Sequence, residues 1–136
     1  MTKEEFKDIE KLYHYTSFES AVKIIESGVM KFSPLQRMND INEKYRQIYL
    51  SSQIITNNNF TQVYNDCVNI LSKFKQISFT CDEQKRLGFD ISAMWGHYAQ
   101  RGDGVCLLFD KNLIIEEARK NGYEYAVIKY ISEPNK

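Results

Sequence analysis

Apolar positions recur along this chain with two periods, and the local period predicts which segments form helices and which form strands. Residues 12–15 are typical of a short strand. Residues 16–28 carry an apolar stripe at helical spacing, with Thr16 and Glu19 placed to form a capping box and Gly28 placed to end the helix. The chain is therefore expected to open with a strand that runs directly into an amphipathic helix.

Helical and strand patterns continue to alternate through the rest of the chain. Residues 104–109 form an apolar run bounded by turn residues, which is typical of a strand at the centre of a sheet. Asp110 then stands where it can cap the next helix. The other predicted elements are strands at 29–33, 76–81 and 125–131, helices at 60–74, 91–99 and 110–122, and a helical stretch through Tyr45 and Tyr49.

Short strands interleaved with helices favour an α+β fold over a regular parallel sheet. We expect a small mixed or antiparallel β-sheet with flanking helices. A length of 136 residues is close to the usual size of one domain. Because no repeat or Gly-, Pro- or Ser-rich linker divides the chain, we expect a single domain over residues 1–136 with its core at about residues 12–133.

The charge balance narrows the classes of partner. Lysine and arginine together number 18, as do aspartate and glutamate, so the formal net charge is zero. A protein that binds nucleic acids in general usually has more basic than acidic residues, because each neutralised phosphate needs a cation. We therefore expect no general nucleic-acid binding. Zero net charge also gives little repulsion between copies, which favours a homodimer or another protein partner.

Cysteine usage and the start of the chain bear on its location. The three cysteines, Cys67, Cys81 and Cys106, are odd in number and form no C-x-x-C pair, which favours a reducing compartment. The first residues are polar and acidic, and no apolar run is long enough to span a bilayer. We therefore expect a cytoplasmic protein that does not associate with a membrane. Scattered thiols and two distant histidines give no metal-ligand pair, so no metal is expected.

Two polar segments near the start of the chain could carry chemistry. His14, Tyr15 and Thr16 lie where a strand meets a helix, so an imidazole, a hydroxyl and free helix amides could meet an anionic or ribose-bearing ligand. The alternative, which spacing alone favours, is a core or edge histidine beside a capping threonine. Asn39 and Asp40 favour a turn by default, and in a functional interpretation they line the same pocket as His14.

A third segment gathers the only tryptophan, the second histidine and a tyrosine within residues 94–104. Trp95 and Tyr98 are three residues apart, so on a helix they share a face and can present their rings together, with His97 beside them. The alternative is an aromatic plug in the core, followed by a tight glycine turn into the next strand.

In their order along the chain, these segments resemble a known family. The resemblance rests on residues 12–16, 25–28, 31–33, 38–40, 77–79, 94–99 and 104–107, and its most specific parts are Met-Trp-x-His-Tyr-Ala, Gly-Val-Cys and Met-Asn-Asp. Together they resemble the bacterial family called domain of unknown function 2971, roughly from Leu12 to Glu133. Asn39-Asp40 is followed by Ile-Asn-Glu, whereas the family usually continues with Pro-Phe-Glu. Family members are usually longer, so the resemblance implies a chain that lacks the family's C-terminal half.

The family's opening pattern is in turn similar to the NAD-binding core of ADP-ribosyltransferases. That similarity implies an NAD-binding fold and an NAD-dependent ADP-ribosyltransferase or NAD glycohydrolase. It implies that His14 contacts the nicotinamide ribose with help from Thr16, that Tyr98 or Trp95 stacks on nicotinamide, and that an acidic residue, Glu133, steers the transferred ribose. The alternative is a non-catalytic module that binds a nucleotide or a protein partner, including the missing half.

Overall fold

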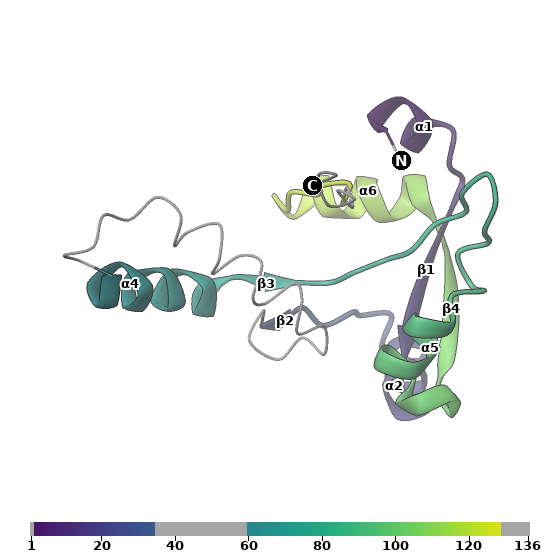
Figure 1. The fold of residues 1–136 in the computed structure, drawn as a ribbon. Coiled ribbons are helices and arrows are strands. Elements are labelled where there is room, and N and C mark those ends of the chain that lie inside the picture. Colours follow the sequence, from purple (N-terminus) through teal and green to yellow (C-terminus); the bar gives the residue numbers. More distant parts are fainter. Residues whose placement is uncertain (1, 35–59, 129–136) are drawn as a thin grey trace, which may run out of the picture. The chain divides into compact units, whose positions relative to one another are not determined.

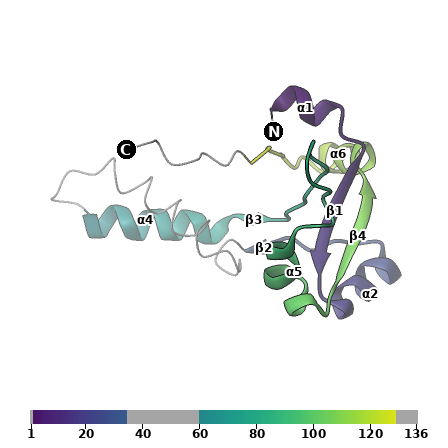
Figure 2. The ribbon, with the colours of Figure 1, turned by 45° about the vertical axis from the view of Figure 1, so that its right-hand side comes forward.

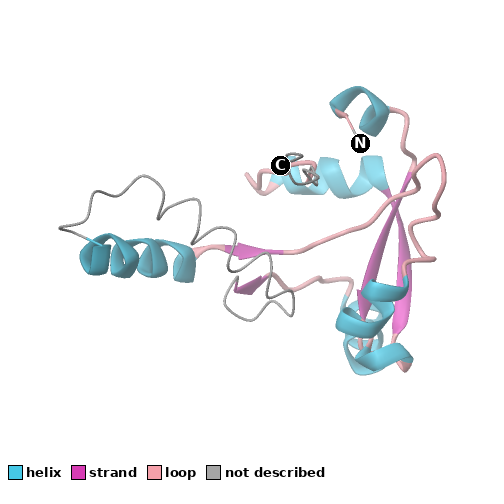
Figure 3. Ribbon diagram, viewed as in Figure 1, coloured by secondary structure: helices cyan, strands magenta, loops and turns pink. Residues whose placement is uncertain are grey.

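The computed structural model describes residues 2–34 and 60–128, which form helices and short antiparallel strands (Figure 1). Figure 3 shows the two kinds of element interleaved along the chain, and the predicted α+β class is confirmed. The chain divides into two compact units, one from residues 1–18 and 79–136 and the other from residues 19–78. The expected single domain over residues 1–136 stays a prediction.

The first unit is built on an antiparallel pair of strands. Strand β1 (Lys11–Thr16) pairs with β4 (Val105–Asp110) along its whole length, and the two run side by side in Figures 1 and 2. On the other edge of β1, Tyr13 and Thr80 exchange two backbone hydrogen bonds of 2.8 Å. Strand β1 therefore lies between two neighbours, and its Leu12, Tyr13 and Tyr15 are buried.

This arrangement corrects one prediction from the sequence. The strand expected at 104–109 exists, but among the described residues β4 pairs with β1 alone, so β1 and not β4 is central. An apolar run shows that a segment is shielded, but it does not show which strands lie beside it. Residues 125–128 are not in a strand, and the rest of the strand expected at 125–131 lies outside the described residues.

Helices flank this strand pair. They are α1 (Lys3–Lys7), α5 (Ser92–Tyr98) and α6 (Lys111–Lys120), with a 3₁₀ turn η2 (Gln100–Gly102) between α5 and β4. As predicted, Asp110 caps α6, and its Oδ1 accepts a hydrogen bond of 3.1 Å from the backbone N–H of Leu113. The turn from η2 into β4 passes so close to β1 that a Cβ on Gly104 would overlap the carbonyl oxygen of Thr16.

The second unit contains the elements between the two segments of the first. They are α2 (Phe18–Ser27), β2 (Ser33–Pro34), α4 (Phe60–Lys73) and β3 (Lys75–Gln76), and β2 pairs antiparallel with β3. The predicted helices at 16–28 and 60–74 are confirmed, whereas the strands expected at 29–33 and 76–81 are paired only in part. The helical stretch expected through Tyr45 and Tyr49 lies outside the described residues.

The start of α2 also corrects a prediction. Thr16 is the last residue of β1 and α2 begins at Phe18, so the capping position falls on Ser17 instead of Thr16. Glu19 accepts a hydrogen bond of 2.6 Å from Lys23 one turn further on. The end of the helix is as predicted, because Gly28 takes the left-handed conformation with φ of 66°. In residues 2–34 and 60–128, no helix is both long and apolar enough to cross a membrane.

Candidate functional site

Strand β1 divides the predicted site between two faces of the strand pair. Successive side chains of a strand point to opposite faces. Tyr13 and Tyr15 therefore lie on one face, which we call the Tyr15 face, and His14 and Thr16 lie on the other, which we call the His14 face. The sequence neighbours His14, Tyr15 and Thr16 cannot all meet one ligand on one face.

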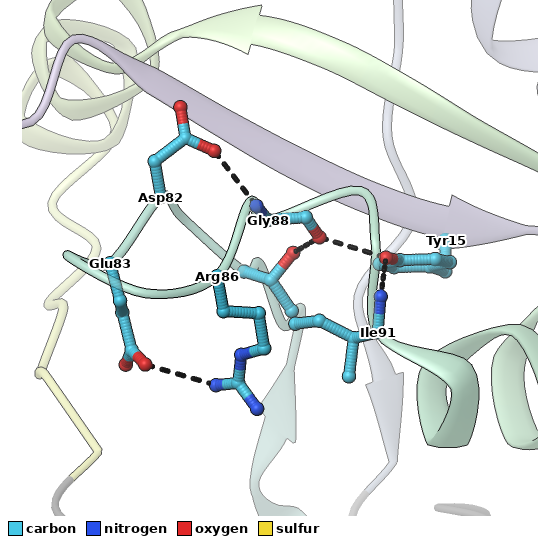
Figure 4. A network of polar contacts seen from close by, with 7 residues as sticks. Tyr15, Asp82, Glu83, Arg86, Gly88 and Ile91 are labelled. Atoms are coloured by element: carbon cyan, nitrogen blue, oxygen red, sulfur yellow. Dashed lines mark hydrogen bonds and ion pairs between the residues drawn. The ribbon is translucent and has the colours of Figure 1, made fainter.

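On the Tyr15 face, the carbonyl of Gly88 is the centre of a polar network (Figure 4). The Gly88 oxygen accepts hydrogen bonds from the Tyr15 hydroxyl at 2.8 Å and the Thr80 hydroxyl at 2.6 Å. The backbone N–H of Ile91 donates to the Tyr15 oxygen at 3.4 Å. Tyr15 thus joins the buried strand to the loop that leads into α5.

Asp82 secures the other side of the same loop (Figure 4). Its Oδ1 accepts a hydrogen bond from the Gly88 N–H at 2.8 Å, and its Oδ2 accepts one from the Tyr13 hydroxyl at 3.1 Å. Glu83 and Arg86 close the tip with an ion pair of 3.1 Å and two backbone hydrogen bonds. Because both Asp82 oxygens are engaged, this carboxylate holds the loop in place.

Trp95 completes the Tyr15 face with its ring. The indole packs edge-on against Tyr15 with ring centroids 5.1 Å apart, and its Nε1–H donates to the Phe89 carbonyl at 2.8 Å. Both features fix the indole within the fold, as a core aromatic would be fixed. His97 and Tyr98 lie in the same helix, α5, where His97 is exposed and Tyr98 is half-buried. Trp95 and Tyr98 therefore lie on one helix, as predicted, and the Trp95 ring packs against Tyr15.

Burial sets the protonation of the groups near this face. It raises the pKa of Tyr15, and for Tyr13 the hydrogen bond to Asp82 adds to the same effect. Burial likewise raises the pKa of the Cys81 and Cys106 thiols. A thiol with a raised pKa carries little thiolate at neutral pH, and the thiolate is the nucleophilic form. Neither cysteine is therefore activated for nucleophilic catalysis.

The His14 face has a different character. The imidazole lies beside the ring of Phe79, with ring centroids 5.6 Å apart and planes at 53°. Phe79 in turn packs edge-on against Phe109 at 6.0 Å, and Leu107 lies opposite His14 on β4. All four side chains are half-buried. They form what we call the His14 cluster (His14, Phe79, Leu107 and Phe109), a titratable ring set among apolar groups.

Sequence reasoning missed several residues that build the two faces. Phe79 was given no place in the predicted site, yet it is the aromatic neighbour of His14. Gly88 and Asp82 belong to no recognised motif, and the turn-forming residues around them were the only indication of a loop. The predicted site residues Asn39, Asp40 and Glu133 lie outside the described residues. Within the described part of the chain, no three His, Cys, Asp or Glu residues gather as a metal site would require.

Comparison with known proteins supports the family resemblance over one part of the chain. No curated protein and no solved structure matches. The model of the family described as "Protein of unknown function (DUF2971)" matches residues 94–136. This stretch begins at Met94 and includes most of α5 and all of β4 and α6, so it contains the Met-Trp-x-His-Tyr-Ala and Gly-Val-Cys motifs. Residues 94–136 of this chain are therefore similar to the DUF2971 family, whose function is not known.

Proposed function

We propose that this chain is an ADP-ribosyltransferase-like protein of the DUF2971 family that binds NAD or a related nucleotide on its His14 face. The observation that carries the proposal is the half-buried imidazole of His14, 5.6 Å from the Phe79 ring. A ribose hydroxyl can exchange hydrogen bonds with an imidazole, and a flat base can pack against an aromatic ring. The two groups that a nucleoside needs thus lie side by side.

Phe79 takes the stacking role that the resemblance gives to Trp95 or Tyr98. The indole of Trp95 packs on Tyr15 and its N–H is bonded to Phe89, so that ring already has its partners on the Tyr15 face. Phe79 lies on the same face as His14 and contacts it directly. This choice moves the stacking ring from α5 to the segment beside β1.

A matched pair of substitutions tests the binding site by calorimetric titration with NAD and with ADP-ribose. Phe79→Leu should weaken binding about tenfold, because base-aromatic contacts are worth roughly 1–3 kcal/mol. Phe89→Leu is the control, because Phe89 is an aromatic of the same kind packed against Tyr13 on the opposite face. His14→Ala should abolish binding. Equal losses in both phenylalanine variants would place the ligand elsewhere.

Catalysis is a separate step from binding. Breaking the bond between nicotinamide and ribose develops positive charge on the sugar, which a carboxylate must stabilise. The resemblance assigns this role to Glu133. Glu133→Gln should therefore bind NAD as well as the unmodified chain does and release no nicotinamide. Equal nicotinamide release by both proteins would rule out Glu133, and no release by either would favour a non-catalytic nucleotide-binding module.

A second candidate function, binding of a protein partner, is favoured by the loop at residues 82–91. Leu87 is 50% exposed and Phe89 46% exposed, on either side of the buried Gly88. The hydrogen bonds of Gly88 and Asp82 hold this loop in one conformation, which lowers the entropic cost of docking. With zero net charge, a second copy is the simplest partner. Sedimentation should show a dimer that Leu87→Asp dissociates, and a monomer at all concentrations would exclude this homodimer.

A further inference from the structure

Lys111 is a buried cation in an unfavourable position. It is the first residue of α6 and is only 5% exposed. The amino end of a helix carries partial positive charge, so a cation there is disfavoured. Burying an ammonium group also costs free energy unless it is hydrogen-bonded. A compensating group must therefore lie close to the Lys111 ammonium.

Helix α1 supplies that compensation. The Lys111 Nζ donates hydrogen bonds to the carbonyl oxygens of Phe6 at 2.9 Å and Lys7 at 2.7 Å, in the last residues of α1. It also lies 5.1 Å from the centroid of the Phe6 ring. The last carbonyls of a helix have no partner within the helix and carry partial negative charge. The Lys111 ammonium therefore satisfies the Lys7 carbonyl, adds a second hydrogen bond to the Phe6 carbonyl, which also accepts one of 3.3 Å from the Ile9 N–H, and is itself stabilised by both oxygens.

Helix α1 in turn has little other support. It has only five residues, none of them buried, and a helix this short is not stable in isolation. Its own capping box joins Thr2 to Glu5, and its Phe6 ring contacts Tyr125 at 6.0 Å. The order of α1 therefore depends on the Lys111 contact to a large extent.

We infer that residues 2–10 form a strap that Lys111 latches, and that this strap can open while the strands stay paired. The strap is held by the ammonium contacts and the Phe6 ring, whereas β1 is held along its length by β4 and by Thr80. The carbonyl of Glu10 accepts a hydrogen bond of 2.9 Å from the Lys111 N–H, which marks where the strap joins the strand pair. Opening exposes the Lys111 ammonium to solvent. This inference is independent of nucleotide binding.

Hydrogen exchange of the full chain tests the latch. Lys111→Met removes the ammonium but keeps an apolar side chain, and Lys120→Met is the control because Lys120 is an exposed lysine of the same helix. The amides of Phe6, Asp8 and Ile9 should exchange at least about tenfold faster in Lys111→Met, since hydrogen bonds to a charged group are lost. The amides of Tyr13 and Thr80, each of which donates to the carbonyl of the other residue, should keep their exchange rates in both variants. Unchanged strap amides, or equal acceleration at Tyr13 and Thr80, would overturn the inference.

Amine labelling of the unmodified chain gives a second measurement that does not depend on the Lys111 variant. With an acetylating reagent, Lys111 should react at least about tenfold more slowly than Lys120, because only the open strap exposes its ammonium. Phe6→Ala should raise the rate at Lys111 and leave the rate at Lys120 unchanged. If Lys111 reacts as fast as Lys120 in the unmodified chain, the strap does not cover it and the inference fails.

Discussion

At the scale of single residues, Gly88 is a position that leaves no room for a side chain. Its carbonyl accepts two hydrogen bonds and its N–H donates a third. A Cβ built on it would overlap the Tyr13 ring, with Cε2 at 2.7 Å and the Cys81 carbonyl carbon at 2.9 Å. The loop backbone can approach β1 this closely only because residue 88 has no side chain.

Gly88→Ala should therefore lower the free energy of unfolding by about 2 kcal/mol, the usual cost of an extra methyl group in a packed site. Gly96→Ala is the control, because Gly96 lies in α5 with no atom within 4 Å of a built Cβ. This control should raise the free energy of unfolding by roughly 0.5–1 kcal/mol through helix propensity. Urea unfolding measures both. A stable Gly88→Ala variant would mean that the loop does not lie against Tyr13.

The raised tyrosine pKa values predict how stability depends on pH. Burial raises the pKa of Tyr15 above its model-peptide value of 10.0, so the unfolded chain loses this proton at a lower pH than the folded chain. The contribution of Tyr15 is complete below pH 10.0 and is lost as the pH rises through the folded-state pKa. The free energy of unfolding should therefore fall above about pH 10. Tyr15→Phe should make that fall shallower, and an identical pH profile would contradict the burial of Tyr15.

At the scale of elements, the local pattern predicted most helices and the two main strands. The residues of β1 and β4 were identified from their apolar character, and α4 and α6 from their helical period. The strands predicted at 29–33 and 76–81 were too long, because within these ranges only Ser33, Gln76 and Thr80 are paired. Pairing depends on partners distant in sequence, and the period of one segment carries no information about them.

The cap of α6 is a prediction that belongs to one element. Asp110→Ala removes the acceptor of the Leu113 N–H and should lower the free energy of unfolding by about 1 kcal/mol. Asp103→Ala is the matched control, because Asp103 is an exposed aspartate that follows the 3₁₀ turn and does not begin a helix. Thermal or urea unfolding of both variants measures the difference. Equal effects in both variants would show that the loss is one of charge and not of capping.

At the scale of the whole molecule, sequence reasoning named His14 as a candidate site residue but did not predict which side chains surround it. The alternation of β1 could have separated His14 from Tyr15, since neighbouring strand residues face opposite ways. Nothing local indicated that α5 would place Trp95 against Tyr15, or that Phe79 would lie beside His14. Both contacts join segments far apart in the sequence, so only the folded chain shows them.

The most direct test of the nucleotide site is a titration of the full chain with NAD, monitored both by calorimetry and by tryptophan fluorescence. Trp95 is the only tryptophan and lies on the face opposite His14, so it reports on the Tyr15 face alone. We predict saturable heat of binding that disappears in His14→Ala, with no change in Trp95 emission. Absence of heat, or quenching of Trp95 that persists in His14→Ala, would contradict a nucleotide site on the His14 face.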